Sequence, residues 1–196
     1  MWRGAHAPIT HLQADYIVGI ASFYNRGVAE EQPVYDRLRA LGIDYERYEH
    51  PPVATVDAAA EHWAPIAAMH CKNLFLRNQK GTRHYLVIVV YTKRVDLRAV
   101  ANQIGDGKLS FASPDRLLAH LGVEPGSVSP FGLIHDRQRH VRVFLDRDLR
   151  HASRISFHPN VNTVTLVLTL ADFHRFLASC GNPVAWISME GATVNG

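Results

Sequence analysis

The chain has few cysteines, no long apolar run and no large excess of either charge. These shortages argue against a disulfide framework, against a membrane span, and against reading a partner from charge alone. Its two cysteines, Cys71 and Cys180, are too few for a disulfide framework, and they lack the CxxC spacing of a closed zinc site. A reducing compartment fits this cysteine usage best, so we expect a cytoplasmic protein.

No apolar stretch approaches the roughly 18 residues that a membrane-spanning helix needs. The run YIVGIASFY at 16–24 is too short and too interrupted to cross a bilayer. The first residues, MWRGAHAPITH, lack the apolar core and cleavage site of a signal peptide. We therefore expect no membrane partner.

The charge is close to balanced, with 21 basic and 18 acidic residues and a net charge of +3. This permits a nucleic-acid partner without requiring one. Basic and acidic residues alternate in places, as in DRDLR at 146–150, which is typical of a mixed, solvated surface. Charge alone therefore does not identify the partner.

Twelve histidines raise the question of a metal, but no HExxH motif and no close His/Cys pairing is present. His70 and Cys71 are adjacent, and neighbours on a strand point to opposite faces. We expect no metal and no other cofactor. Cys71 is expected to be buried and inert.

Periodicity and end signals place the helices and strands. Residues 1–30 have weak periodicity and form an extension of unknown role, whereas 31–190 are expected to fold as one domain. The first expected elements are a helix from Pro33 to Gly42, a strand within 44–50, an extended turn at His50-Pro51-Pro52 and a helix at 56–64 capped by Thr55. A hairpin at 73–91 that turns near Gly81 follows, and then a helix at 94–103, a helix from Ser113 to Gly122 and a loop at 123–132. The last elements are a strand at 140–146, strand residues within 154–169 around a Pro/Asn turn, a helix from Thr169 to Gly181 and a strand at 184–189.

Strands and helices mix here without strict βαβ alternation, and the run from Tyr85 to Tyr91 is apolar throughout, as in a strand covered on both faces. The pattern predicts an α/β or α+β fold around one mixed sheet that curls toward a barrel.

A charged residue, Lys72, lies at the start of the strand HCKNLFL. Alternation places Lys72 on one face with Leu74 and Leu76, and Asn73 on the other. Lys72 is either a strand-end lysine that extends to water or a cation held at the edge of a pocket. Periodicity alone favours the first.

Two loops carry polar groups that suit a ligand. PGSVSPFG at 125–132 is stiff, and its N–H groups and hydroxyls can face a polar ligand or phosphate. FHPNVNT at 157–163 places His158, Asn160, Asn162 and Thr163 before a strand. Each is also compatible with an ordinary connector or turn.

Taken in order, YDRLRALGIDYERYEHPPVAT, CKNLFLRNQKGTRHYLVIV, GVEPGSVSPFGLI and FHPNVNTVTLVL resemble the YbaK/prolyl-tRNA-synthetase-associated editing domain family. The chain is most similar to the free-standing prolyl-tRNA editing branch, which hydrolyses alanine from mischarged tRNA-Pro. The likeness runs from about Pro33 to Met189 and leaves residues 1–30 outside.

The resemblance implies an aminoacyl-tRNA hydrolase without a metal, in which the ribose 2′-hydroxyl of the terminal adenosine assists the attacking water. The family's lysine falls on Lys72 and its histidine on His158. We expect Lys72 to hold the terminal phosphate or the ester end and His158 to orient substrate or water. The residues expected to bind substrate are Asn73, Gly126, Ser127, Ser129 and Phe157, which match the family's pattern, together with Thr55 and Asn160. Backbone N–H groups of the loop at 125–129 would stabilise the oxyanion. The implied partner is the acceptor end of tRNA-Pro, with prolyl-tRNA synthetase or an elongation factor as further partners.

Ala-tRNA-Pro is the expected substrate, because a small pocket that Phe157 helps to bound excludes the larger proline sterically. Three alternatives remain open: a deacylase for cysteine- or serine-charged tRNA, a non-catalytic module that binds tRNA or a synthetase, and a small-molecule hydrolase without an RNA partner.

Overall fold

The computed structural model describes residues 31–52 and 62–189. Thr55 and residues 1–30 lie outside the described residues, as does most of the helix expected at 56–64. Within the described ranges, no helix combines the length and apolar character required to span a bilayer.

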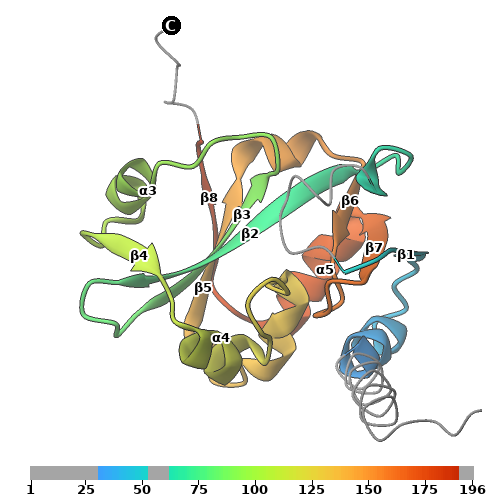
Figure 1. The fold of residues 1–196 in the computed structure, drawn as a ribbon, viewed down its shortest axis with the longest axis horizontal. Helices are drawn as coiled ribbons and strands as arrows, with labels where there is room; N and C mark the ends of the chain where they lie inside the picture. The colour runs from blue at the N-terminus through green and yellow to red at the C-terminus, as the bar shows by residue number, and fades with distance from the viewer. Residues whose placement is uncertain (1–30, 53–61, 190–196) are drawn as a thin grey trace, which may run out of the picture.

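One eight-stranded sheet forms the centre of the molecule, in the order β1-β7-β6-β2-β3-β5-β8, with β4 paired to β2 (Figure 1). The strands are β1 (Glu46–Glu49), β2 (Met69–Asn78), β3 (His84–Val90), β4 (Leu109–Phe111), β5 (Val141–Asp146), β6 (Arg154–Phe157), β7 (Val164–Thr169) and β8 (Val184–Ile187). The pairs β2–β6, β3–β5 and β5–β8 are parallel, and the others are antiparallel. The predicted α/β fold with a mixed sheet is confirmed. Its end strands β1 and β8 are not paired with each other, so the described sheet stays open.

The sheet joins parts of the chain that are far apart in sequence. In the antiparallel pair β1–β7, Glu46 lies opposite Val167 and Glu49 lies opposite Val164. The predicted hairpin is confirmed as β2–β3, in which Cys71 lies opposite Val90.

Local end signals define the helices. Residues 31–40 are helical, and α3 (Leu97–Ile104), α4 (Pro114–Leu121) and α5 (Leu170–Cys180) follow. As predicted, Ser113 and Thr169 cap α4 and α5 through their side chains. The predicted start of α3 at residue 94 is wrong, because the Asp96 side chain accepts a hydrogen bond from the Arg98 N–H and caps the helix there.

The core has two parts, one on each face of the central strands. Leu86 and Ile88 of β3 pack into the main core with α4, α5 and helix 31–40, whereas Val87 and Val89 face α3. Figure 1 shows α3 apart from α4 and α5, as this division requires. The prediction that this strand is covered on both faces is confirmed.

Further features differ from the sequence prediction. The loop expected at 123–132 ends at Ser129, where the 3-10 helix η1 (Pro130–His135) begins, and β4 and the 3-10 helix η2 (Arg147–His151) were not predicted. The solvated surface predicted for 146–150 is wrong at Asp146, which is fully buried and has its Oδ1 2.9 Å from the Nζ of Lys93.

Candidate functional site

An edge of β2 is left without a partner strand near its start. On one side, β2 pairs with β3 from Cys71 onward. On the other side, β6 pairs only with Met69 and His70, and β4 pairs only from Leu76. No described strand covers the edge between these two points. The divergence of β6 and β4 therefore opens the sheet beside residues 71–74.

The loop that follows α4 crosses this opening. The Asn73 Nδ2 donates a hydrogen bond to the Val128 carbonyl at 3.0 Å. The Ser129 Oγ donates to the His158 carbonyl at 2.5 Å and accepts from the Phe131 N–H at 3.2 Å. Ser129 is fully buried. These bonds bring three of the predicted site segments, 72–73, 125–129 and 157–160, to one place.

Lys72 and Asn73 point to opposite faces of the sheet. Their pairing with β3 is regular over residues 71–77, so no bulge turns either side chain. Asn73 faces the loop on the main-core side, while the Lys72 ammonium donates to the Lys93 carbonyl. The opening at the edge of β2 is therefore bordered by Lys72 from one face and by Asn73 from the other.

A short parallel pairing joins β2 to β6 just before the two residues predicted to be catalytic. His70 lies opposite Ser156, and the His70 Nδ1 is 2.7 Å from the Ser156 Oγ. Lys72 lies two residues further along β2, and His158 directly follows the end of β6. The pairing therefore brings the backbones of both segments to the same end of the opening.

The His158 side chain is half-buried, with its Nε2 fully buried, and it lies beside a second histidine, His50, for which the sequence predicts an extended turn. The ring centroids of His50 and His158 are 5.7 Å apart, and the His50 Nε2 is 3.1 Å from the Thr165 Oγ1. Burial, reinforced by the charge of His50, lowers the pKa of His158 to about 4. His158 is therefore neutral near pH 7 and acts as a hydrogen-bonding group rather than as a cation.

Several buried polar atoms of this site have no hydrogen-bond partner among the described residues. They are the Asn73 Oδ1, the His158 Nε2, and both side-chain polar atoms of Asn160. Asn160 is 1% exposed, and its backbone has a positive φ of 66°. Buried polar atoms are nearly always paired, and leaving one unpaired costs about 1–3 kcal/mol. Several such atoms on neighbouring segments mark a candidate binding site for a polar ligand.

The loop also offers backbone donors. The Ser127 N–H donates to the Glu124 carbonyl at 3.1 Å and is thereby occupied. No described residue accepts a hydrogen bond from the N–H groups of Gly126, Val128 or Ser129. Gly126 has a φ of 90°, a conformation that side-chain-bearing residues rarely adopt. These three amides are the donors that the loop can present to an oxyanion.

Two predicted residues face the main core rather than the opening. Phe157 is 3% exposed and packs against Phe131 and Phe173, with ring centroids 6.1 and 4.6 Å away. Phe157 can shape the site only from behind. The predicted burial of Cys71 is confirmed, and this burial raises the pKa of its thiol, which disfavours a nucleophilic thiolate.

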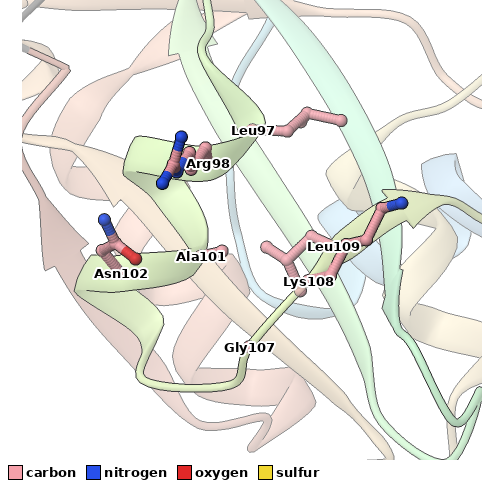
Figure 2. Close-up of a pocket in the computed structure, with 7 residues that line it drawn as sticks. All are labelled: Leu97, Arg98, Ala101, Asn102, Gly107, Lys108 and Leu109. Carbon is pink, nitrogen blue, oxygen red and sulfur yellow. The ribbon is translucent and has the colours of Figure 1, made fainter.

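A separate pocket of about 480 Å³ lies between α3 and β4 (Figure 2). Leu97, Ala101 and Leu109 line it together with the basic residues Arg98 and Lys108. It contains none of the predicted site residues.

Comparison with known proteins identifies the family. The model of the aminoacyl-tRNA editing domain family matches residues 50–176, a range that contains every predicted site residue. The chain belongs to this family. The resemblance found in the sequence is confirmed, as is the activity class that it implies, an aminoacyl-tRNA hydrolase.

Among members of this editing family, the prolyl-tRNA editing protein ProX of Acetoanaerobium sticklandii is 39% identical over 152 residues, covering 78% of this chain and 93% of ProX. The prolyl-tRNA synthetase associated domain-containing protein 1 of Bos taurus is 34% identical over 150 residues, covering 74% of this chain and 87% of the relative. A solved structure described as a candidate trans-editing enzyme for prolyl-tRNA synthetase has a TM-score of 0.61 at 24% identity, covering 83% of this chain and 98% of that one. It supports the editing-domain fold.

Proposed function

We propose that the chain hydrolyses the ester of mischarged tRNA-Pro in trans, with Ala-tRNA-Pro as its preferred substrate. The family and the similarity to ProX support the prolyl system. The observation that carries the proposal is the set of buried polar atoms without a described partner on Asn73, His158 and Asn160, beside the open edge of β2. Such atoms suit a ligand rich in hydroxyl and carbonyl groups, as the aminoacylated terminal adenosine is.

The reaction depends more on positioning the attacking water and stabilising the oxyanion than on strong acid–base catalysis, because an aminoacyl ester is already activated. Water adds to the ester carbonyl, negative charge develops on its oxygen, and the ribose 3′-oxygen then leaves and takes up a proton, giving alanine and free tRNA. In this scheme the N–H groups of Gly126, Val128 and Ser129, which have no described acceptor, stabilise that oxyanion. The 2′-hydroxyl of the same ribose assists the water.

His158 is assigned to orient the substrate or the water, since its low pKa makes its imidazole a weak base. Lys72 is assigned to the terminal phosphate or the ester end, which it would reach from the opposite face to Asn73. Both residues bind and position in this scheme, and neither forms a covalent intermediate.

Steric exclusion accounts for the preference for alanine. Proline is larger than alanine, and a closely packed site excludes a group that is too large more readily than one that is too small. Phe157, held in the core by Phe131 and Phe173, supports the site from behind and resists its widening for a larger group. Serine and glycine esters are the competitors that such a site would admit.

The remaining parts of the proposal concern the whole protein. Residues 31–190 form the editing domain, and 1–30 are an extension to it. The acceptor end of tRNA-Pro is the principal partner, with prolyl-tRNA synthetase or an elongation factor as further partners, in the cytoplasm.

The decisive experiment measures deacylation of tRNA-Pro charged with alanine, serine, cysteine or proline. We expect rapid loss of alanine and retention of proline. Lys72→Ala should lower kcat/KM at least about tenfold, a loss of about 1.4 kcal/mol of transition-state stabilisation. The matched control is Lys80→Ala, an exposed lysine in the turn after β2.

The alternative functions predict different results in the same assay. Full activity of Lys72→Ala would remove Lys72 from the mechanism. A preference for the serine or cysteine ester would replace the proposed substrate. Tight tRNA binding without deacylation of any ester would indicate a binding module.

A further inference from the structure

A cluster of metal-ligating side chains lies outside the candidate site. His120 near the end of α4, Asp136 directly after η1 and His140 directly before β5 each offer one ligand atom, and these atoms all lie within 4.8 Å of one another. Asp136 is buried, His120 is half-buried and His140 is exposed. No local motif predicts this cluster, because its members are 16 and 4 residues apart and come from α4 and from the connection between η1 and β5.

The Asp136 carboxylate is fixed in place but not neutralised. Its Oδ2 accepts from the Val141 N–H and the Asn182 Nδ2, both at 2.7 Å. Its Oδ1 accepts only from the His140 N–H at 3.1 Å, which leaves a lone pair free. Within the described ranges, no lysine or arginine forms an ion pair with Asp136. A buried carboxylate without a cationic partner is costly, and a bound cation would relieve that cost.

A further imidazole packs against His120 but does not join the cluster. The ring of His84 is 4.0 Å from that of His120 between centroids. His84 itself is not a ligand, because its Nε2 lies 2.8 Å from the Arg116 guanidinium and must accept that hydrogen bond.

We propose that His120, Asp136 and His140 bind one divalent transition-metal ion of the zinc type. Two imidazole nitrogens and a carboxylate oxygen are ligands that zinc accepts, with water at the fourth position. Tetrahedral coordination at about 2.0–2.1 Å requires the ligand atoms to approach to about 3.3 Å of one another. The exposed side chain of His140 can make this movement, while Asp136 is already held by three donors.

The ion would have a structural effect. It would tie the end of α4 to the start of β5 and so clamp both ends of the segment that contains Gly126 and Ser129. The inference does not depend on the proposed function, because the cluster shares no residue with the candidate site.

The test uses the tag-free, full-length protein after chelator treatment, titrated with Zn²⁺ by calorimetry and with Co²⁺ by visible absorption. We expect one ion per chain, the visible bands of four-coordinate Co²⁺ and a higher melting temperature with Zn²⁺. His120→Gln and His140→Gln should each weaken Zn²⁺ binding at least about tenfold and abolish the thermal shift, since metal binding to the folded state stabilises it.

His151→Gln is the matched control, because His151 is exposed at the end of η2. It should bind Zn²⁺ like the unaltered protein. Absence of stoichiometric binding, or binding that survives in both His120→Gln and His140→Gln, would overturn the proposal. Circular dichroism of the metal-free variants separates lost ligands from lost folding.

Discussion

At the scale of single residues, Asn73 links the sheet to the loop that closes the candidate site. Its Nδ2 donates to the Val128 carbonyl, and its Oδ1 is buried with no described partner. One end of the amide therefore positions the loop, while the other end would bind the substrate in the proposed site. This division explains why an amide occupies a strand position where an apolar side chain would pack as well.

Asn73→Ala should lower kcat/KM for Ala-tRNA-Pro by about 10- to 100-fold, because the loop loses its tether and the substrate loses an acceptor. Steady-state deacylation measures the effect. Gln79→Ala, which removes an exposed amide just after β2, should leave activity unchanged. Equal activities of the two variants would contradict the assignment.

The low pKa of His158 predicts how stability depends on pH. Above the ordinary pKa of 6.5, neither the folded nor the unfolded chain protonates this residue. Between 6.5 and about 4 the unfolded chain binds a proton that the folded chain does not, so the free energy of unfolding falls as the pH falls. Below about 4 this contribution levels off.

His158→Gln should therefore flatten the acid side of the stability profile, by at most about 3 kcal/mol, in urea unfolding measured across this pH range. His84, whose pKa burial also lowers to about 4, will retain part of the slope. His151→Gln should reproduce the unaltered profile. If His158→Gln did the same, His158 would not be buried as described.

At the scale of elements, the loop before η1 depends on a glycine backbone. Gly126 has a φ of 90°, and an added Cβ would meet only the Asn162 Nδ2 at 3.9 Å. Space is therefore available, and a substitution would act through the backbone alone. Gly107, between α3 and β4, offers a comparison, with a φ of 57° and nothing within 4 Å.

Gly126→Ala and Gly107→Ala should each cost about 1–2 kcal/mol of stability, because both place a side chain in the left-handed region. Only Gly126→Ala should also reduce kcat, since it moves the amides offered to the oxyanion. Thermal unfolding and deacylation, measured on both variants, separate the two effects. If Gly107→Ala lost as much activity as Gly126→Ala, the loss in both variants would follow from their lower stability.

The elements that the sequence predicts well are those with local end signals. Ser113, Pro114 and Gly122 define α4 by themselves, and Thr169 and Gly181 do the same for α5. The strand β4 spans only three residues, too few for alternation to be recognised, and it exists because β2 offers it an edge.

The candidate site was predictable as a set of segments but not as a geometry. Asn73, Ser129 and His158 could be named from resemblance, whereas their connection through Val128 and the His158 carbonyl depends on pairing across the sheet. The partial burial of His50 against His158 and the buried state of Asp146 likewise follow from tertiary contacts that no local pattern records.

At the scale of the whole molecule, a buried ion pair connects the end of β3 to the end of β5. Lys93 is 21% exposed in its side chain and lies 2.9 Å from the fully buried carboxylate of Asp146. The Asp148 carboxylate, on η2, lies 2.6 Å from the same ammonium. This arrangement holds the two central strands next to the carbonyl that Lys72 contacts.

Lys93→Ala should destabilise the protein by about 2–4 kcal/mol, because Asp146 would stay buried without its cation. Chemical denaturation provides the measurement. Arg39→Ala, which removes an exposed pair with Asp36, should cost no more than about 0.5 kcal/mol. Similar losses in the two variants would show that Asp146 does not need its partner.

The pairing of β1 with β7 affects when the protein can fold during its synthesis. Glu46 pairs with Val167, more than a hundred residues later, and the site forms only when residues 73, 128 and 158 come together. Contacts so distant in sequence make folding slow, and a chain leaves the ribosome from its N-terminus. We infer that a nascent or prematurely terminated copy has no editing activity at all until β7 has emerged. Chains that terminate before β7 should therefore be inactive, rather than hydrolases of reduced specificity.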